Sequence, residues 1–324
     1  SFFTFVIQLE KNIGMIVTRD TEILKDIELV ATIGFFDGVH LGHRFLIEEM
    51  LSVARSRKLP AAVITFPEHP RAVLHADYQP KLLNSFEEKL MHLESTGVDY
   101  CIVLDFTPEL SQLSAKEFIQ EILCKRIHVN TLLIGYDHRF GRNRADGFEQ
   151  YVEYGKSCGM DVIQASPYSP GMEHVSSSEV RKQLDHCRVD KAAALLGYPY
   201  MIKGSIVSGY KIGRTIGFPT ANIRVDEPFK VLPGIGIYAV WVNLNGIRYK
   251  GMLYIGCRPT IDNNLDMALE VNILNFSGDI YNAQLEVVFV RFMREDIKFE
   301  SLEALRAQLE IDREEVDALL SGLE

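Results

Sequence analysis

The pattern of hydrophobic residues changes once along the chain, at about residue 187, and this change constrains the fold more than any other feature. Before it, short apolar runs alternate with segments of helical periodicity. That alternation predicts an α/β domain in which helices cover both faces of a parallel sheet. After about residue 200, apolar runs are separated only by turn residues, and several alternate with period two. The second pattern predicts an antiparallel sheet or a small barrel.

The expected elements can be given as residue ranges. In the first part the strands and helices are expected, in chain order, at 29–35, 41–57, 61–66, 86–96, 100–106, 115–125, 131–135, 148–157 and 161–165. In the second part strands are expected at 201–207, 238–244, 248–255, 269–276 and 284–292, followed by an amphipathic helix at 301–320.

These patterns predict two domains joined by a helix. An α/β doubly wound parallel-sheet domain is expected at 15–186, a linker helix at 187–199, and a small antiparallel β-barrel domain with a C-terminal helix at 200–324. A length of 324 residues agrees with two domains. Met15 begins the segment MIVTRDTEI, so residues 1–14 are left out of the fold prediction.

Composition excludes several classes of protein. With 34 Lys and Arg against 44 Asp and Glu, the net charge of −10 argues against a general nucleic-acid or anionic-membrane binder. No apolar run approaches the ~20 residues of a membrane helix, and the apolar start of the chain lacks the basic region of a signal peptide. The five cysteines are scattered, which argues against a disulfide framework or a thiolate zinc site and favours a cytoplasmic location.

The segment at 32–43, TIGFFDGVHLGH, reads as a strand, a tight turn and the start of a helix near Leu41. A helix N-terminus presents free N–H groups and the positive end of the helix dipole, which suits a phosphate. His40 and His43 fall on one side of the first turn, where they could donate hydrogen bonds to a phosphoryl group. Two surface histidines would produce the same pattern. The Walker sequence is absent, so a P-loop is excluded.

Three further segments add polar groups to the same region. They are TFPEHP at 65–70, IGYDHRFGRNRADG at 134–147 and VSSSEVR at 175–181. In a doubly wound sheet such loops meet at the carboxyl edge of the strands, where ligands bind. A crevice that collects His, Arg, Ser and Asp is suited to adenylyl transfer onto a phosphate acceptor.

These strings, in this order, resemble the nucleotidylyltransferase superfamily, and more closely the adenylyltransferase module of bacterial bifunctional riboflavin kinase/FAD synthetases. The resemblance implies that His40 and His43 bind and polarise the phosphates of ATP, and that Ser177, Ser178 and Arg181 clamp the triphosphate. It also implies further ATP contacts at Gly34, Phe35, Asp37 and Gly42. On the flavin side it implies His69, Asp137 and Arg139. His138 stands where the family usually has Phe, and Ser178 replaces a Thr but keeps the hydroxyl.

The second part of the chain contains a glycine-rich segment that ends in P-T-A-N. Four of its residues suit a flexible flap over the polyphosphate of ATP, namely Gly209, Lys211, Gly213 and Arg214. If the chain at 220–222 is extended, Thr220 and Asn222 point to the same face. A hydroxyl and a carboxamide oxygen are hard ligands of the kind that Mg²⁺ accepts, so these two residues are the expected metal site.

The strand expected at 269–276 reads LEVNILNF and places Glu270 and Asn272 on one face. A single carboxylate near Mg–ATP could hold an alcohol and accept its proton as the bond to phosphorus forms. An exposed glutamate with no catalytic role would give the same pattern.

The second part also resembles a known family. GRTIGFPTAN, LPGIGIYAV, GMLYIGCRPT and LEVNILNF are similar to the motifs of riboflavin kinases. The resemblance implies a six-stranded antiparallel barrel closed by a C-terminal helix, with Thr220 and Asn222 holding Mg–ATP and Glu270 as catalytic base. Tyr254 stands where the family commonly has Asn, and Asn272 where it commonly has His. Neither of these two is expected to touch the chemistry.

The sequence therefore predicts a bifunctional, cytoplasmic enzyme that makes both flavin cofactors. One module would phosphorylate riboflavin with ATP to give FMN, and the other would adenylylate FMN to FAD with release of pyrophosphate, with Mg²⁺ as cofactor. Two alternatives stay open at this point. One is an adenylyltransferase for another phosphate acceptor, such as a pantetheine or nicotinamide mononucleotide. The other is a flavin-binding protein without turnover. The oligomeric state does not follow from the sequence.

Overall fold

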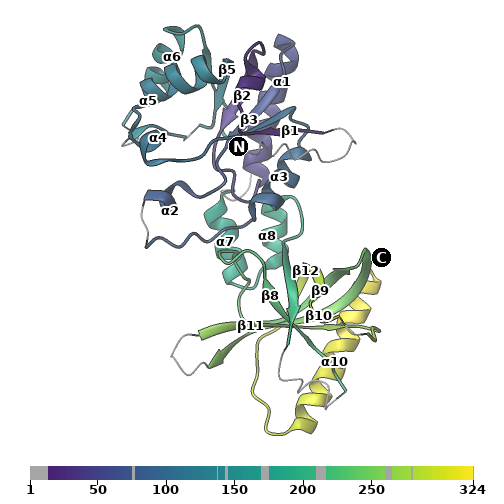
Figure 1. Ribbon diagram of the computed structural model, residues 1–324. Helices are drawn as coiled ribbons and strands as arrows, with labels where there is room; N and C mark the ends of the chain where they lie inside the picture. Colours follow the sequence, from purple (N-terminus) through teal and green to yellow (C-terminus); the bar gives the residue numbers. More distant parts are fainter. Residues whose placement is uncertain are drawn as a thin grey trace, which may run out of the picture. The chain divides into compact units, whose positions relative to one another are not determined.

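The computed structural model describes residues 14–74, 77–136, 138–142, 145–168, 175–208, 217–259, 265–278 and 280–323. The chain forms two compact units, residues 1–174 and 175–324, which are described separately (Figure 1). Residues 175–186, which the sequence prediction placed in the first domain, therefore pack within the second unit. In the described residues, no helix is both long enough and apolar enough to span a bilayer.

The first unit contains a parallel sheet of six strands. In chain order they are β1 (Ile16–Thr18), β2 (Leu29–Ile33), β3 (Ala61–Thr65), β4 (Tyr100–Val103), β5 (Val129–Ile134) and β6 (Asp161–Gln164). Their spatial order is β1-β4-β3-β2-β5-β6. The chain thus builds the sheet outward from β2 in one direction and then returns to add β5 on the other side. This reversal places a topological switch point between β2 and β5.

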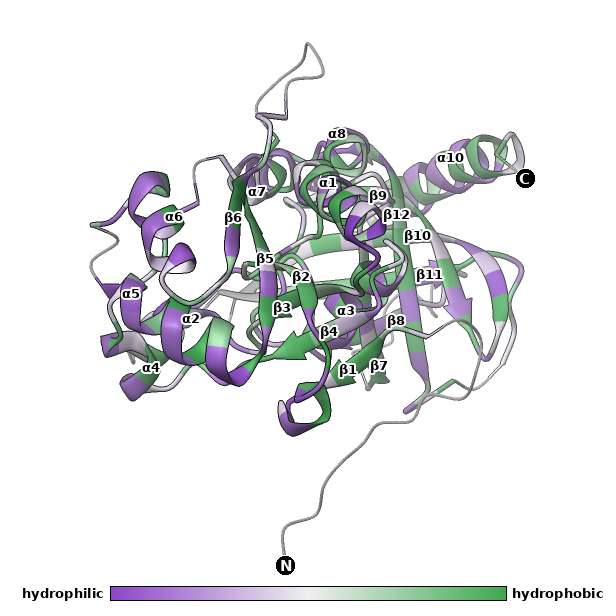
Figure 2. Ribbon diagram, turned by 90° about the horizontal axis from the view of Figure 1, so that it is seen from above, coloured by the Kyte–Doolittle hydropathy of each residue, from purple (hydrophilic) through white to green (hydrophobic). Residues whose placement is uncertain are grey.

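Helices cover both faces of this sheet. One face packs against α1 (Leu41–Arg57) and α3 (Phe86–Glu94). The other packs against α4 (Pro108–Gln112), α5 (Ala115–Glu117), η2 (Phe118–Arg126) and α6 (Phe148–Lys156). Two short helices, η1 (Glu22–Leu24) and α2 (Pro70–Leu74), also belong to the described part of the unit. The apolar colour of β2, β3 and β5 in Figure 2 reflects their burial between the two layers. The predicted doubly wound α/β fold is confirmed.

One predicted helix has a different form. The segment expected as a single helix at 115–125 consists of the short α5 followed by the π-helical η2. In the π-helix each N–H bonds five residues back, as at its end, where the Ile127 N–H donates to the Ile122 carbonyl at 2.9 Å. Hydrophobic periodicity cannot distinguish these windings over so short a segment, so the sequence predicted only a helix.

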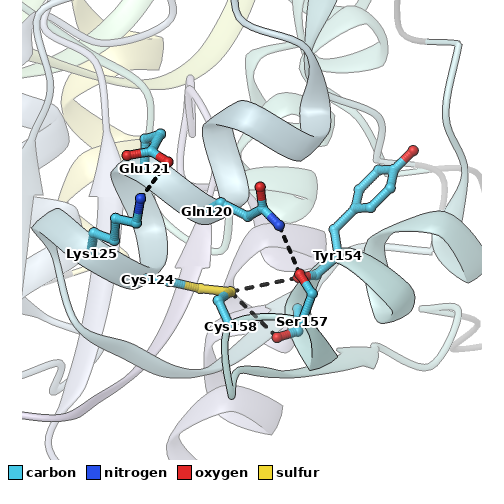
Figure 3. Close-up of a disulfide and its surroundings, with 8 residues drawn as sticks. Gln120, Glu121, Cys124, Lys125, Tyr154, Ser157 and Cys158 are labelled. Atoms are coloured by element: carbon cyan, nitrogen blue, oxygen red, sulfur yellow. Dashed lines mark hydrogen bonds and ion pairs between the residues drawn. A yellow bond between two sulfur atoms is a disulfide. The ribbon is translucent and has the colours of Figure 1, made fainter.

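A disulfide joins Cys124, near the end of η2, to Cys158, just after α6 (Figure 3). The Gln120 side chain donates to the Ser157 hydroxyl at 2.8 Å and links the same two elements. The sequence argued against a disulfide framework and did not predict this single bond, while Cys101, Cys187 and Cys257 are free. The two paired residues are 34 apart in sequence, and only the packing of α6 against η2 brings their Cα atoms to 6.4 Å.

The second unit is a closed antiparallel barrel of six strands. They are β7 (Met201–Val207), β8 (Ala221–Val225), β9 (Gly236–Leu244), β10 (Ile247–Pro259), β11 (Leu265–Ile273) and β12 (Gln284–Arg294). The helices of this unit in the described residues are α7 (Ser177–Asp185), α8 (Val189–Leu196) and α10 (Leu302–Ser321). The barrel with its C-terminal helix is confirmed, and α8 corresponds to the expected linker helix, with Gly197 ending it in the left-handed conformation.

The C-terminal helix α10 packs on the outer face of the barrel. Val316 and Leu320 of this helix lie against an apolar patch that includes Trp241. A buried ion pair adds to this contact, because the Arg294 guanidinium donates to both carboxylate oxygens of Asp312, with the shortest contact at 2.7 Å. The Asp312 residue is only 2% exposed. The ion pair therefore holds the end of β12 to the middle of α10.

We predict that Asp312→Ala destabilises the barrel by about 3 kcal/mol, because the substitution leaves the Arg294 guanidinium largely buried and without its carboxylate. Urea unfolding followed by the fluorescence of Trp241, the single tryptophan, measures the effect in this unit. Glu310→Ala is the matched control. It removes an exposed ion pair with Arg306 on the same helix and should cost less than about 1 kcal/mol. Equal destabilisation by the two variants would contradict the prediction.

Candidate functional site

The loop between β2 and α1 has an unusual backbone. Phe36 (φ 54°), Gly38 (φ 85°) and Val39 (φ 36°) all lie in the left-handed region. Glycine adopts this conformation readily, but a β-branched valine adopts it only at a cost in energy. Residues held in such conformations concentrate at functional sites. The loop leaves the sheet beside the switch point, so its place in the topology also marks it as a candidate site.

His40 and His43 lie together at the start of α1. His40 is the N-cap residue, and its Nδ1 accepts the backbone N–H of His43 at 3.3 Å. Because Nδ1 is an acceptor, the neutral His40 ring carries its proton on Nε2. The two rings stack with their centroids 3.6 Å apart, and the Phe36 ring packs edge-on against His43 at 5.2 Å. The sequence prediction that the two histidines share one side of the first helical turn is confirmed.

His43 is uncharged at neutral pH. Burial lowers its pKa well below the usual 6.5, and the nearby His40, His138 and Lys89 lower it further. Its Nδ1 is buried, and no described residue forms a hydrogen bond with it. A neutral imidazole can act toward a phosphate as a hydrogen-bond donor from one nitrogen, without adding a buried charge.

Lys89 on α3 is a residue that the sequence analysis missed. Its Nζ donates to the carbonyl oxygens of Phe66 at 2.7 Å and Phe35 at 3.2 Å, just beyond the ends of β3 and β2. It also lies 4.2 Å from the centroid of the Phe35 ring. Burial lowers its pKa to about 8, against the opposing effect of the Asp37 carboxylate. The sequence contained one signal for this lysine. Lys89 follows Phe86 by three residues and precedes Leu93 by four, so it lies on the apolar face of the helix.

Asp37, an expected ATP contact, is almost fully buried in the same loop. Its Oδ1 accepts the backbone N–H groups of Leu83 at 2.9 Å and Asn84 at 3.3 Å. These bonds attach the loop to the segment that leads into α3. Asp37 therefore has a clear structural role, and its contact with ATP stays a prediction.

The residues expected on the flavin side lie on neighbouring loops. The His69 ring packs edge-on against Phe35 at 4.8 Å, which joins the loop after β3 to the loop after β2. His138, in the loop after β5, is close enough to His43 to affect its pKa. Arg139 is exposed and forms no hydrogen bond or ion pair with the described residues, while Asp137 lies outside them. The structure thus unites His40, His43, Phe35 and His69 but adds no support for Arg139.

The Ser–Arg motif begins α7, as expected. Ser176 caps this helix, with its hydroxyl accepting the Glu179 N–H at 3.2 Å, and Ser177, Ser178 and Arg181 occupy the first turns. All of them belong to the second unit. That they join His40 and His43 around a triphosphate stays a prediction.

A second polar cluster lies on the outer face of the barrel. Glu270 on β11 pairs directly with Asn222 on β8, and the Thr220 hydroxyl donates to Glu270 Oε2 at 3.1 Å. Thr220 and Asn222 therefore lie on the same face, as the spacing predicted, and Glu270 lies between them and β10. The flap residues expected beside this cluster, Gly209, Lys211, Gly213 and Arg214, lie outside the described residues.

Tyr254 and Asn272 are both neighbours of this cluster, and the expectation that neither touches the chemistry stays a prediction. Tyr254 on β10 pairs directly with Glu270, and its hydroxyl donates to the Asp296 carboxylate at 2.9 Å. Burial raises the pKa of Tyr254 to about 12, and the hydrogen bond to Asp296 contributes further. The Asn272 amide donates to the Pro219 carbonyl at 2.8 Å and so supports the P-T-A-N segment. Cross-strand register, which the sequence did not reveal, makes them neighbours.

The donors of this cluster fit a magnesium ion that is bound mainly through a nucleotide. Among the described residues, no group of three or more His, Cys, Asp or Glu side chains could hold a metal ion by itself. The cluster offers one hydroxyl, one carboxamide and one carboxylate, all with hard oxygen atoms. Mg²⁺ accepts such ligands, retains several waters and takes the others from phosphates.

Two family models match successive parts of the chain. The family model described as FAD synthetase matches residues 23–179, and the one described as riboflavin kinase matches residues 196–320. Relatives named bifunctional riboflavin kinase/FMN adenylyltransferase include proteins from Listeria monocytogenes and Haemophilus influenzae. The first is 36% identical, with 92% of this chain and 95% of the relative covered. The second is 38% identical, with 90% of this chain and 94% of the relative covered.

The fold of the chain has a counterpart among solved structures. A crystal structure described as a macrolide-efflux protein from Streptococcus pneumoniae matches with a TM-score of 0.82 at 30% identity. The match covers 93% of this chain and 97% of that one, so it extends over both units.

We predict that the His43 ring stays neutral as the pH falls through 6.5, whereas it takes up a proton near 6.5 in the urea-unfolded chain. The unfolded state then binds more protons than the folded state in this window, so the first unit loses stability as the pH falls below 6.5. Imidazole ¹⁵N NMR measures the titration, with His43→Gln used to assign the resonance. A folded-state midpoint at or above 6.5 would contradict the prediction.

Proposed function

The chain belongs to the family of bifunctional riboflavin kinase/FMN adenylyltransferases, and from that premise we propose which residues carry each of its two reactions. The enzyme phosphorylates riboflavin to FMN and adenylylates FMN to FAD, with riboflavin, FMN and ATP as substrates. The two alternatives, an adenylyltransferase for another acceptor and a flavin-binding protein without turnover, are therefore not retained.

The kinase reaction is assigned to the cluster on the barrel. Glu270 accepts the proton of the riboflavin 5′-hydroxyl as its oxygen forms a bond to the γ-phosphorus of ATP and the bond to the leaving ADP breaks. The observation that supports this role is the Thr220 hydroxyl, which donates to Glu270 at 3.1 Å and orients the carboxylate. Asn222 on the adjacent strand β8 pairs directly with Glu270 and so lies beside the carboxylate.

Thr220 and Asn222 would hold Mg²⁺ together with the phosphates of ATP. Their hydroxyl and carboxamide oxygens are suitable ligands on one face of the barrel. When bound, the ion neutralises charge on the phosphates. The flap residues Gly209, Lys211, Gly213 and Arg214 are proposed to cover the same nucleotide, on the basis of the family resemblance.

The adenylyl transfer is assigned to the site at the start of α1. A phosphate oxygen of FMN attacks the α-phosphorus of ATP, and pyrophosphate leaves as the bond to the β-phosphate breaks. The stacked pair of His40 and His43 carries this assignment, since both lie at a helix N-terminus beside the switch point. The neutral His43 donates a hydrogen bond to charge that develops on the phosphate oxygens.

Further contacts in this reaction are proposed from the family resemblance. Gly34 and Gly42, which lack a side chain, are proposed to let the nucleotide approach the backbone. Phe35 and Asp37 line the loop, while Ser177, Ser178 and Arg181 would clamp the triphosphate. On the flavin side the proposal retains His69, Asp137 and Arg139, of which His69 has the support of its contact with Phe35.

A cytoplasmic location is also part of the proposal. Both reactions consume ATP, which is an intracellular nucleotide, and three of the five cysteines are free. The net charge of −10 supports the further proposal that neither nucleic acid nor an anionic membrane is a partner.

We predict that Glu270→Gln abolishes FMN formation, because an amide cannot accept the proton of the substrate hydroxyl. FAD formation from supplied FMN should be largely unaffected. Chromatographic separation of flavins over time, in protein incubated with riboflavin and Mg–ATP, measures both reactions. Glu286→Gln is the control, since β12 does not pair with β11, and it should retain both activities. Kinase turnover that survives in Glu270→Gln would show that Glu270 is not the base.

We predict that His43→Ala impairs adenylyl transfer and leaves the kinase reaction intact, the reverse of Glu270→Gln. Loss of its hydrogen-bond donor should slow the conversion of FMN to FAD by ~10²-fold, while riboflavin phosphorylation continues at its normal rate. Pyrophosphate release with FMN as substrate provides the measurement. His186→Ala, which removes an exposed imidazole, should change neither rate. An unchanged adenylylation rate in His43→Ala would remove the site at α1 from the proposal.

A further inference from the structure

Lys89 is a buried charge for which the two reactions, as assigned above, provide no role. It is only 3% exposed, and it forms no ion pair with a carboxylate of the described residues. Taking an ammonium group out of water is costly unless its donors are satisfied, and lysine is rarely buried without a charged partner. Its partners here are two backbone carbonyls and the rings of Phe35 and Phe86, so the ammonium is fixed at one place in the fold.

The two carbonyls belong to neighbouring loops of the adenylyl-transfer site. The Phe35 carbonyl lies in the loop that leads to His40, and the Phe66 carbonyl lies in the loop that leads to His69. These loops leave β2 and β3, which are adjacent parallel strands. Beyond the last residue pair of the strands, Ile33 and Ile64, one further backbone hydrogen bond joins the two segments, from the Gly34 N–H to the Ile64 carbonyl at 3.1 Å. Past this bond, the Lys89 ammonium connects the two loops through the Phe35 and Phe66 carbonyls.

Phe35 is held in two ways at once. Its carbonyl accepts both the Lys89 ammonium at 3.2 Å and the Thr65 hydroxyl at 3.3 Å. Its ring lies 4.2 Å from the same ammonium, which is a cation–π contact. The ring also packs edge-on against His69 at 4.8 Å. A change at Lys89 would therefore act on the loop of His40 and, through the Phe35 ring, on the loop of His69.

We propose that Lys89 is a positioning residue for adenylyl transfer, which holds the loop of His40 at a set distance from the loop of His69. This inference rests on the proposed placement of that reaction in the first unit. The FMN phosphate oxygen must approach the α-phosphorus in line with the departing pyrophosphate. Small errors in the relative position of two bound substrates reduce the rate of such a displacement strongly, whereas they change the binding of each substrate less.

The experiment compares Lys89→Met, which keeps the length of the side chain but removes the charge and the donors, with the native enzyme. We expect kcat for FMN adenylylation to fall by at least about 10-fold, while KM for ATP and for FMN changes by less than about 3-fold. The riboflavin kinase activity of the same chain should be unchanged and serves as an internal control. Lys125→Met, which removes an exposed lysine paired with Glu121, is the matched control variant.

A conservative variant separates positioning from a general effect on packing. Lys89→Arg retains the charge and the N–H donors and should restore kcat to within about 3-fold of the native value. The inference is overturned if Lys89→Met keeps kcat within 2-fold of native, or if Lys89→Arg is as slow as Lys89→Met. Should Lys89→Met fail to fold, Thr65→Val replaces it, because it removes the second donor to the Phe35 carbonyl and no charge. An unchanged kcat in Thr65→Val would then overturn the inference.

His43→Ala, measured in the same assay, separates the role of Lys89 from the placement of adenylyl transfer in the first unit. If His43→Ala is slow and Lys89→Met is not, the role of Lys89 is wrong and the placement of adenylyl transfer stands. If both variants form FAD at the native rate, the placement itself is wrong.

Discussion

The first unit depends on the burial of β2 and β3 on both faces of the sheet. Every residue of these two strands is buried, so helices must cover both sides. The helices that connect successive strands make these strands parallel. The loops that follow parallel strands all lie at the same edge of the sheet, at the carboxyl ends of the strands. For this reason Phe35 and His69, which are far apart in the chain, meet beside the start of α1. The constraint that stabilises the core is thus the one that assembles the site.

The second unit assembles its polar cluster by a different route. In the barrel no helix N-terminus is involved, and cross-strand register places Asn222, Glu270 and Tyr254 in one row over three strands. A closed barrel permits no slippage of this register, because a shift by one residue would turn Glu270 toward the apolar interior. In the assignment proposed above, flavin and ATP are bound by loops at a sheet edge in one unit and by a strand face in the other.

Local signals in the sequence were sufficient for much of this architecture. The helix expected at 41–57 and the strand expected at 201–207 have the same bounds in the structure, since their periodicity and capping are local properties. The contacts of Lys89 with Phe66 and the pairing of Cys124 with Cys158 could not be predicted, because they arise only when distant elements pack. Likewise the closeness of Tyr254 to Glu270 depends on strand register, which a motif read along one strand does not contain.

The electrostatics of the two units suit an acidic enzyme that handles polyphosphates. With a net charge of −10, the chain cannot rely on a generally basic surface to attract ATP. The positive charge near His43 is instead placed inside the fold, where Lys89 is shielded from solvent and held by carbonyls. That fixed charge also favours the neutral form of His43. A neutral donor beside a buried, immobile cation is already oriented before the substrate arrives. Such groups need not reorient as charge develops in the reaction, whereas water molecules would have to.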